Sequence, residues 1–390
     1  MIVKGRKRLV FKLLILLLLV VFIEGASRLV FYAFKTSRAA QSKKFRAVSD
    51  ERRSRINNPV RAFDYPYLPF IPKQNTNPVH NASKKGFRGK DFKKEKAEGN
   101  YRIFCLGGST TYGISLKEEE TYPHNLEVFL NEYFKSKIKG KIEVINAGEI
   151  SWTSMELLIQ MSVRCMQYDP DLFIYYEGIN DVSPAFVNAG MKFSGDYSHY
   201  RSGEFNPPKL SFFDKVPRCL DYSALFTLIR WRILRKDPTM GLLWTNQAGA
   251  GLEKYKPVIK KENYVGLEVL RRNLVSMAGI ASIHKIPLVF FPQFYQQRGS
   301  GRSSGANIWG SEEITNAMKE NYEIQKDVAK QFTDWVIYID ILKEFNEVKE
   351  ELTDAIHFTP KGSAKLAVIM GNHLVPVLDK EFKRKGLYKE

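Results

Sequence analysis

The chain has 390 residues, of which 44% are hydrophobic and 26% charged, and its formal net charge is +18. This composition is typical of a folded globular protein, and the lack of repeats, heptads and low-complexity runs excludes a solenoid or a coiled coil. The excess of Lys and Arg indicates an anionic neighbour. Because the basic residues are scattered and no nucleic-acid-binding module is present, we favour a membrane surface and expect no nucleic-acid partner.

The three cysteines predict neither a disulfide framework nor a metal site. Cys105 lies in an apolar strand-like run and Cys165 in a helix-like one, so both are expected to be small buried hydrophobic residues. With Cys219 the count is odd, and the spacings fit no zinc pattern.

The first 35 residues have the features of an export signal. Basic residues between Lys4 and Lys12 precede an unbroken apolar run from Leu13 to Ile23. A cleaved signal peptide and an uncleaved membrane anchor are both consistent with this pattern. We favour the anchor because the cleavage site is weak and hydrophobicity resumes at Leu29, giving about the 20 residues that cross a bilayer. The positive charge predicts a cytoplasmic N-terminus and an extracytoplasmic remainder, in a single-pass membrane protein.

Residues 36–99 are expected to form a stalk and an N-terminal extension. Dense charge comes first, followed by the Pro-aromatic segment 65–70, which favours an extended stretch packed on a surface. The segment 86–89, Gly-Phe-Arg-Gly, predicts a turn that docks one aromatic ring.

From Tyr101 onward, apolar strands alternate with amphipathic helices. The pattern predicts strands at 101–106, 141–146, 171–176, 287–291 and 335–340, and helices at 122–137, 154–168, 265–284, 312–332 and 360–383. Continuous apolar strands indicate a parallel sheet covered by helices on both faces. The predicted fold class is therefore α/β, a three-layer α/β/α sandwich. Residues 100–184 and 262–390 would form this domain, and residues 185–261 an insertion that could cap a site.

Three short stretches follow strands of this sheet and carry polar side chains suited to acyl transfer. They are Gly107-Gly108-Ser109-Thr110, Gly178-Ile179-Asn180-Asp181 and Asp354-Ala355-Ile356-His357. Ligands bind beyond the carboxyl ends of the strands in open α/β sheets, so these stretches are expected to meet at one edge.

The residue types predict a nucleophile, a base and a charge-stabilising donor. Ser109 can attack an ester carbonyl if a base removes its proton, and His357 is the candidate base. Asp354, three residues earlier, can orient the imidazole. The amide of Asn180 can donate to the oxyanion, together with backbone N–H groups of Ser109 and of the loop after Asn146.

Each stretch alone has a simpler interpretation. Gly-Gly-Ser-Thr is often a flexible turn, Gly-x-Asn-Asp a capped turn, and Asp-x-x-His a helix N-cap with a surface histidine. Their occurrence together, each after a strand of one sheet, favours the catalytic interpretation. The other histidines lack such a setting and are expected to be surface or packing residues.

These stretches resemble the sequence blocks of the SGNH hydrolases, or GDSL-type esterases and lipases, over about residues 101–367. The resemblance implies Ser109 as nucleophile, Asn180 in the oxyanion hole, and His357 with Asp354 as base and orienting acid. It also implies a flavodoxin-like fold with a parallel central sheet, no metal and no organic cofactor. The segment 86–89 resembles an extension in membrane-anchored members.

Two positions depart from the family pattern. In the block 146–154, the family's oxyanion glycine falls at Ser151, where a side chain can prevent the required backbone conformation; Gly148 is a second candidate. Gly108 stands where the family name implies Asp, a variation that the family tolerates.

Three functions remain open at this point. The first is an exported, membrane-anchored serine ester hydrolase that acts on acyl esters, particularly acetyl esters, of envelope polysaccharide or lipid. The second is an O-acyltransferase with the same triad. The third is a non-catalytic envelope carbohydrate-binding protein that has kept the fold. The sequence specifies neither the acceptor nor the oligomeric state.

Overall fold

A computed structural model describes residues 2–36, 61–62, 67–77, 79–187, 192–193, 195–197, 223–225, 259–297 and 311–389. The chain divides into two compact units, which group residues 1–58 with 201–256 and residues 59–200 with 257–390. Most of the predicted stalk, most of the insertion at 185–261, and Cys219 lie outside the described residues.

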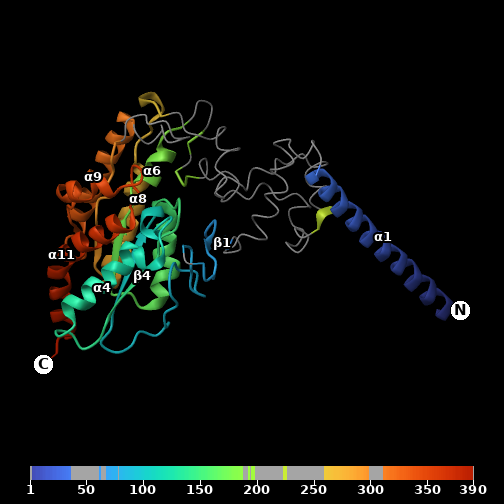
Figure 1. Cartoon of the computed structure of the whole chain (residues 1–390), viewed down its shortest axis with the longest axis horizontal. Coiled ribbons are helices and arrows are strands. Elements are labelled where there is room, and N and C mark those ends of the chain that lie inside the picture. The colour runs from blue at the N-terminus through green and yellow to red at the C-terminus, as the bar shows by residue number, and fades with distance from the viewer. Residues whose placement is uncertain are drawn as a thin grey trace. The chain divides into compact units, whose positions relative to one another are not determined.

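The first unit contains one long helix, α1 (Ile2–Thr36), drawn in blue in Figure 1. Its stretch Phe11–Val30 has a mean hydropathy of 2.4, and only 6% of this stretch is buried within the protein. The helix is therefore long and apolar enough to cross a bilayer. Glu24, inside this stretch, accepts hydrogen bonds from the Ser223 hydroxyl at 2.6 Å and the backbone N–H of Ala224 at 2.8 Å.

The second unit is built on a five-stranded parallel sheet, which confirms the predicted α/β class (Figure 1). Its strands are β3 (Tyr101–Gly107), β4 (Ile142–Asn146), β5 (Leu172–Tyr176), β6 (Leu288–Phe290) and β7 (Val336–Tyr338), in the order β4-β3-β5-β6-β7. This order is that of flavodoxin-like folds. Ile103 of β3 pairs with Val144 on one side and Leu172 on the other, so β3 lies within the sheet.

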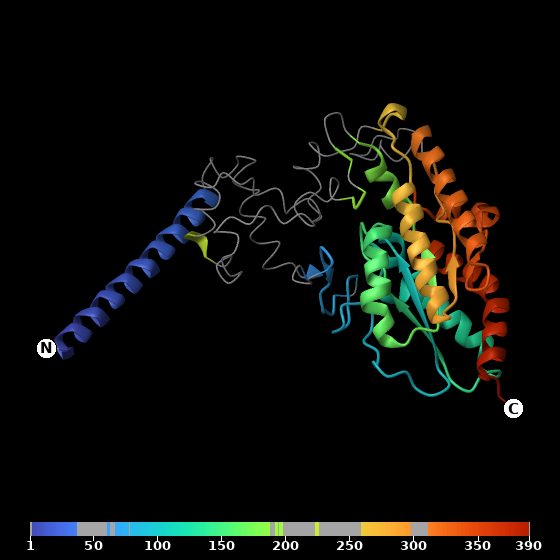
Figure 2. The ribbon, with the colours of Figure 1, turned by 180° about the vertical axis from the view of Figure 1, so that it is seen from behind.

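Helices cover both faces of the sheet, as the fully buried strands require (Figures 1 and 2). One face carries α4 (Tyr122–Phe134) and α11 (Pro360–Lys385), and the other α5 (Ser154–Ile159), α8 (Glu268–His284) and α9 (Glu312–Gln331). Ile103 and Ile174 pack against Leu126 of α4 and Leu374 of α11 in the main core. Short helices α3 (Ser109–Tyr112), α6 (Ile179–Val182) and α10 (Phe345–Val348) follow strand ends or precede α11.

One predicted helix differs from the structure. The pattern at 154–168 predicts a single helix, but α5 ends at Ile159 and continues as a π-helical turn, Gln160–Cys165, and a 3-10 turn, Met166–Tyr168. A π turn holds more residues than an α turn, which an amphipathic pattern does not reveal. From this turn Arg164 donates to the carbonyl of Gly86 at 2.8 Å.

The N-terminal extension packs on the sheet unit through Phe87, at the predicted turn. Phe87 is 1% exposed, and its ring contacts Phe92, Phe104 and Tyr168 at centroid distances of 5.5, 5.8 and 5.6 Å. Two short strands, β1 (Arg61–Ala62) and β2 (Ile71–Pro72), pair in the same extension. The Phe87 ring therefore packs the N-terminal extension against strand β3.

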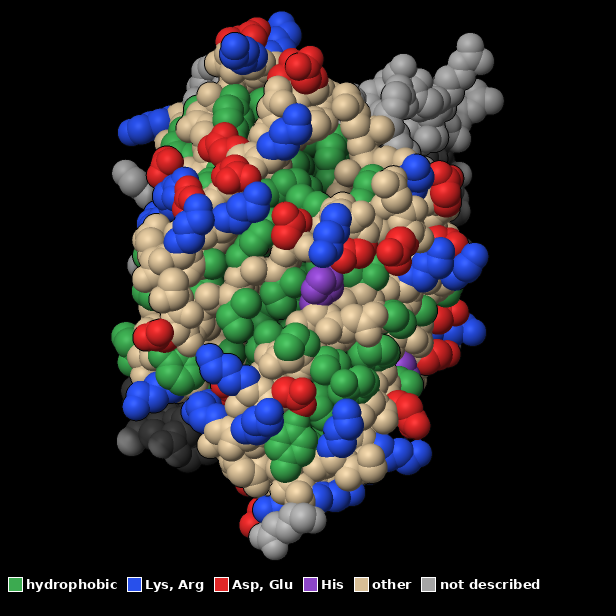
Figure 3. Space-filling view, turned by 90° about the vertical axis from the view of Figure 1, so that its left-hand side faces the viewer, with side chains coloured by type: hydrophobic (Ala, Val, Ile, Leu, Met, Phe, Trp, Pro, Cys, Tyr) green, Lys and Arg blue, Asp and Glu red, His purple; other side chains and the backbone are tan. Residues whose placement is uncertain are grey.

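Charged side chains of both signs are interspersed on the side of the second unit that lies at the left of Figure 1 (Figure 3). Among the described residues drawn there, Lys and Arg do not gather into a single patch.

We expect Phe87→Ala to lower the free energy of unfolding by about 3–5 kcal/mol, because it leaves a cavity among buried rings. Tyr67→Ala is the control, since Tyr67 lies in the same extension and is 61% exposed. Denaturant unfolding of both variants measures the difference. Small and equal losses of unfolding free energy in the two variants would contradict docking of the extension through Phe87.

Candidate active site

The carboxyl ends of three neighbouring strands bring polar residues to one edge of the sheet. Ser109 follows β3, Asn180 follows β5 and Gln293 follows β6. A side chain at position 107 would not fit, because its Cβ would lie 2.6 Å from the carbonyl oxygen of Tyr176. Gly107 therefore leaves room for a sharp turn at the end of β3. The turn places Ser109 at the first position of α3, where it is 7% exposed.

The structure brings Ser109, His357 and Asp354 into one hydrogen-bonded row. The Ser109 Oγ lies 2.7 Å from His357 Nε2, and His357 Nδ1 lies 2.6 Å from Asp354 Oδ2. With the ring proton on Nδ1, the hydroxyl donates to Nε2 and the carboxylate accepts from Nδ1. This is the arrangement in which an imidazole can remove the proton of a serine hydroxyl.

Asp354 is held by the backbone as well as by the ring. Its Oδ1 accepts the N–H of Ile356 at 2.9 Å and that of His357 at 2.8 Å. Burial by itself would raise the pKa of Asp354, but the hydrogen bond and charge of His357, with these N–H groups, lower it to about 2. The carboxylate therefore stays ionised at neutral pH and faces the ring with a fixed negative charge.

Asn180 lies beside the serine turn. Its Nδ2 donates to the carbonyl of Trp152 at 2.9 Å, and a Cβ on Gly108 would overlap with this nitrogen. An amide nitrogen carries two hydrogens, so one remains for a ligand after the bond to Trp152. The backbone N–H of Ser109, at the start of α3, is a second donor in the same turn.

Ser151 adopts a left-handed backbone conformation. Its φ is +66°, in the left-handed region that favours glycine. It lies in a turn closed by a hydrogen bond from the N–H of Trp152 to the carbonyl of Glu149, at 3.3 Å. The side chain of Ser151 therefore does not prevent this conformation.

Gly148, the other candidate from the same block, has its backbone N–H engaged. It donates to Asn146 Oδ1 at 3.1 Å. A Cβ at Gly148 would lie 2.7 Å from the backbone nitrogen of Tyr112, so the absence of a side chain allows close packing of this loop on α3. The backbone N–H of Gly148 is therefore committed within its own loop.

Two buried residues join the loops of the site and were not identified from the sequence. Gln293 Nε2 donates to Thr110 Oγ1 at 3.1 Å, and its Oε1 accepts the N–H of Ile179 at 3.0 Å. Glu177 Oε1 accepts the N–H of Gly178 at 2.9 Å. Both follow strands directly, the same signal that identified Ser109 and Asn180.

Two carboxyl groups behind the site are fully buried. Burial raises the pKa of Glu177 to about 8, although backbone N–H groups of Gly178 and Asn180 oppose the shift. Burial raises the pKa of Asp181 to about 7, although the hydroxyl of Ser154, 2.5 Å from Oδ1, opposes it. These two carboxyl groups fix the loops around the site. They do not face the hydrogen-bonded row formed by Ser109, His357 and Asp354.

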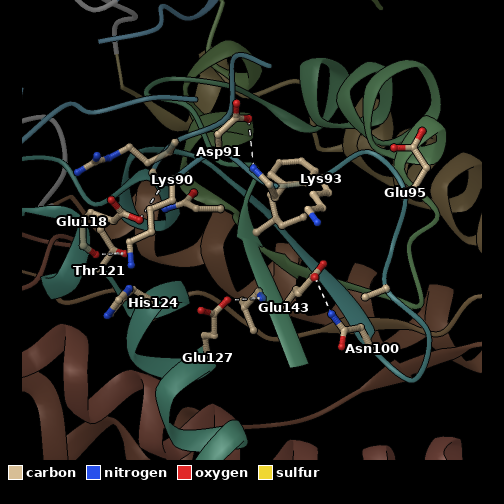
Figure 4. Close-up of a pocket in the computed structure, with 17 residues that line it drawn as sticks. Lys90, Asp91, Lys93, Glu95, Asn100, Glu118, Thr121, His124, Glu127 and Glu143 are labelled. Atoms are coloured by element: carbon tan, nitrogen blue, oxygen red, sulfur yellow. Dashed lines mark hydrogen bonds between the residues drawn. The ribbon is translucent and has the colours of Figure 1, made fainter. Parts of the chain in front are cut away.

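A separate cavity of about 440 Å³ lies between the extension and α4, beside strand β4 (Figure 4). Ser109, Asn180 and His357 do not line it. Two of its carboxylates have structural partners: Glu127 accepts the N–H of Val144, and Glu143 accepts from Asn100 and Arg102.

Within the described parts of the chain, which exclude His199, the remaining histidines do not form a comparable row. His373 pairs with a carboxylate, contrary to our expectation, since its Nε2 lies 3.0 Å from Glu344 Oε1. This pair joins α11 to the turn before α10 and involves no serine hydroxyl. His80 Nδ1 lies 3.2 Å from the Tyr112 hydroxyl. Among the described residues, no three His, Cys, Asp or Glu side chains group so that they could hold a metal ion.

No protein-family model matches this chain, and no curated protein matches it. Solved structures do match it, including the following three. LAE5, an alpha/beta hydrolase enzyme from the metagenome of Lake Arreo, Spain, is 12% identical over 69% of this chain and 93% of its own, with a TM-score of 0.40. The acetylxylan esterase Axe2 from Geobacillus stearothermophilus is 15% identical over 70% and 94%, with a TM-score of 0.40. The lipase/acylhydrolase from Enterococcus faecalis is 14% identical over 74% and 97%, with a TM-score of 0.38.

Similarity at this level does not assign the chain to a family. The fold class rests on the strand order of this chain, and the candidate site on its own residues.

We expect Ser151→Gly to raise the free energy of unfolding by about 1 kcal/mol, because glycine adopts a left-handed φ without steric cost. Ser276→Gly, inside helix α8, is the control and should lower stability, since glycine weakens a helix interior. Thermal unfolding of both variants measures the effect. A Ser151→Gly variant less stable than the starting protein would contradict the left-handed conformation.

Proposed function

We propose that this chain is a membrane-anchored serine ester hydrolase with Ser109, His357 and Asp354 as its triad. The observation that carries the proposal is the unbroken row from the Ser109 hydroxyl through His357 to Asp354, at 2.7 and 2.6 Å. Asn180 beside the serine turn and the resemblance to SGNH hydrolases support the same reaction.

In this mechanism His357 Nε2 takes the proton of Ser109 as Oγ attacks the ester carbonyl. The carbonyl oxygen becomes an oxyanion, which the Asn180 amide and the backbone N–H groups of Ser109 and Ser151 stabilise. Each such donor contributes about 3–4 kcal/mol to the transition state. His357 then protonates the departing alcohol, and water, activated by the same ring, releases the acid. Asp354 holds the ring and stabilises its charged form.

The proposed substrate is an acyl ester, particularly an acetyl ester, of envelope polysaccharide or lipid. The apolar stretch of α1, preceded by basic residues, supports a membrane anchor with a cytoplasmic N-terminus and an extracytoplasmic catalytic domain. A tethered enzyme of net charge +18 would stay close to anionic envelope components. The proposed reaction needs no metal or organic cofactor.

We expect the full-length protein in detergent micelles to hydrolyse p-nitrophenyl acetate, and Ser109→Ala or His357→Ala to lower kcat by roughly 10⁴- to 10⁶-fold. Ser162→Ala, at an exposed helical serine, is the control and should keep the rate. Release of p-nitrophenol and of free acetate is measured together. An unchanged rate in Ser109→Ala would contradict the triad, and p-nitrophenol without acetate in the presence of an acceptor sugar would identify an acyltransferase.

The carboxyl group of Asp354 should stay ionised above about pH 4, because its pKa is lowered to about 2. Infrared difference spectra of the wild-type protein and of Asp354→Asn measure this. A protonated-carboxyl band between about pH 4 and pH 7 that disappears in Asp354→Asn would contradict it.

Asp354→Asn should lower kcat by about four orders of magnitude, because the amide favours the wrong ring tautomer. Asp340→Asn is the control: its Oδ1 also accepts a backbone N–H, from Leu342 at 3.0 Å, but it does not touch the histidine.

A further inference from the structure

Glu177 is a buried acid placed between the two loops of the candidate site. It follows β5, is 1% exposed, and its Oε1 accepts the N–H of Gly178 at 2.9 Å and that of Asn180 at 3.1 Å. One side chain therefore binds the asparagine turn through Gly178 and Asn180, and it lies against the serine turn at Gly108.

Gly108 leaves the space that this carboxyl group occupies. A Cβ at position 108 would overlap with Glu177 Oε2 and with Asn180 Nδ2. This is also the position at which the chain departs from the GDSL pattern, where an aspartate stands. In this chain the carboxyl group that lies against the serine turn belongs to Glu177, the residue that follows β5.

We propose that Glu177 is a positioning residue, whose carboxyl group holds the Asn180 turn and packs against the Ser109 turn at Gly108. Its Oε1 accepts two backbone N–H groups of the Asn180 turn, and its Oε2 lies against Gly108 in the Ser109 turn. The group acts through the backbone of its neighbours and does not touch the reacting atoms.

The inference rests on the proposed hydrolase function, and the wild-type rate on p-nitrophenyl acetate is its baseline. We expect Glu177→Ala to lower kcat about 10- to 100-fold with KM changed less than about threefold, since a misplaced catalytic group mainly affects the transition state. Glu177→Gln should keep kcat within about threefold, because its side-chain oxygen can still accept the two N–H groups of the Asn180 turn. Glu156→Ala is the matched control: Glu156 is equally buried and its Oε2 accepts the N–H of Thr153 at 2.6 Å, and kcat should change less than about threefold.

Full kcat in Glu177→Ala, or an equal loss in Glu156→Ala, would overturn the proposal. Thermal unfolding gives a second readout that does not depend on activity. Gly108→Ala should lower Tm in the Glu177 chain, where the new methyl group overlaps with the carboxyl group and with Asn180 Nδ2, and should lower it by less in Glu177→Ala, where only the overlap with Asn180 remains. Equal shifts in the two chains would contradict the contact even if no ester were cleaved. If the wild-type chain had no Ser109-dependent activity but the two Tm shifts were unequal, the proposed function would be refuted. The contact between Glu177 and Gly108 would then still stand.

Discussion

The hydrogen bond between Ser109 and His357 is the interaction on which the proposed chemistry depends. It joins residues 248 positions apart in the chain, so nothing local in the sequence holds the pair together. The parallel sheet makes the contact possible, because strands that run in the same direction deliver their following loops to one edge. Helices α4 and α11 fix the loop of His357 relative to β3 through the core that they share with the sheet.

Buried polar side chains then align the loops at that edge. Gln293 links Thr110 to the turn of Asn180, and Asn146 Nδ2 donates to the carbonyl of Thr111 at 2.7 Å. Unsatisfied polar groups are costly in such a place, so each of these bonds selects one arrangement of the loops. These bonds form a supporting network around the candidate site, and Glu177 belongs to that network.

The layers of the fold were predicted well from the sequence, because apolar runs and amphipathic periods are both local signals. Apolar runs such as 171–176 and amphipathic periods such as 312–332 depend only on neighbouring residues, and the strands and helices observed agree with them to within about three residues. The break of α5 into a π turn was missed, since an amphipathic pattern does not reveal the hydrogen-bond register of a helix.

The candidate triad could be found from the sequence, whereas its supporting residues could not. Ser109, Asn180 and His357 lie in short stretches of recognisable composition after predicted strands. Glu177 and Gln293 also follow strands, but a buried Glu or Gln acquires its role only from partners elsewhere in the chain. The left-handed φ of Ser151 likewise depends on the turn that contains it, and composition alone favours glycine there.

The most direct measurement is the mass-spectrometric mapping of a fluorophosphonate adduct on the full-length protein. A serine becomes reactive toward this probe when a base takes its proton and nearby donors stabilise the developing charge. A single adduct on Ser109, absent from His357→Ala, is the result that the proposed triad predicts. An adduct on another serine, or undiminished labelling of Ser109 in His357→Ala, would contradict it.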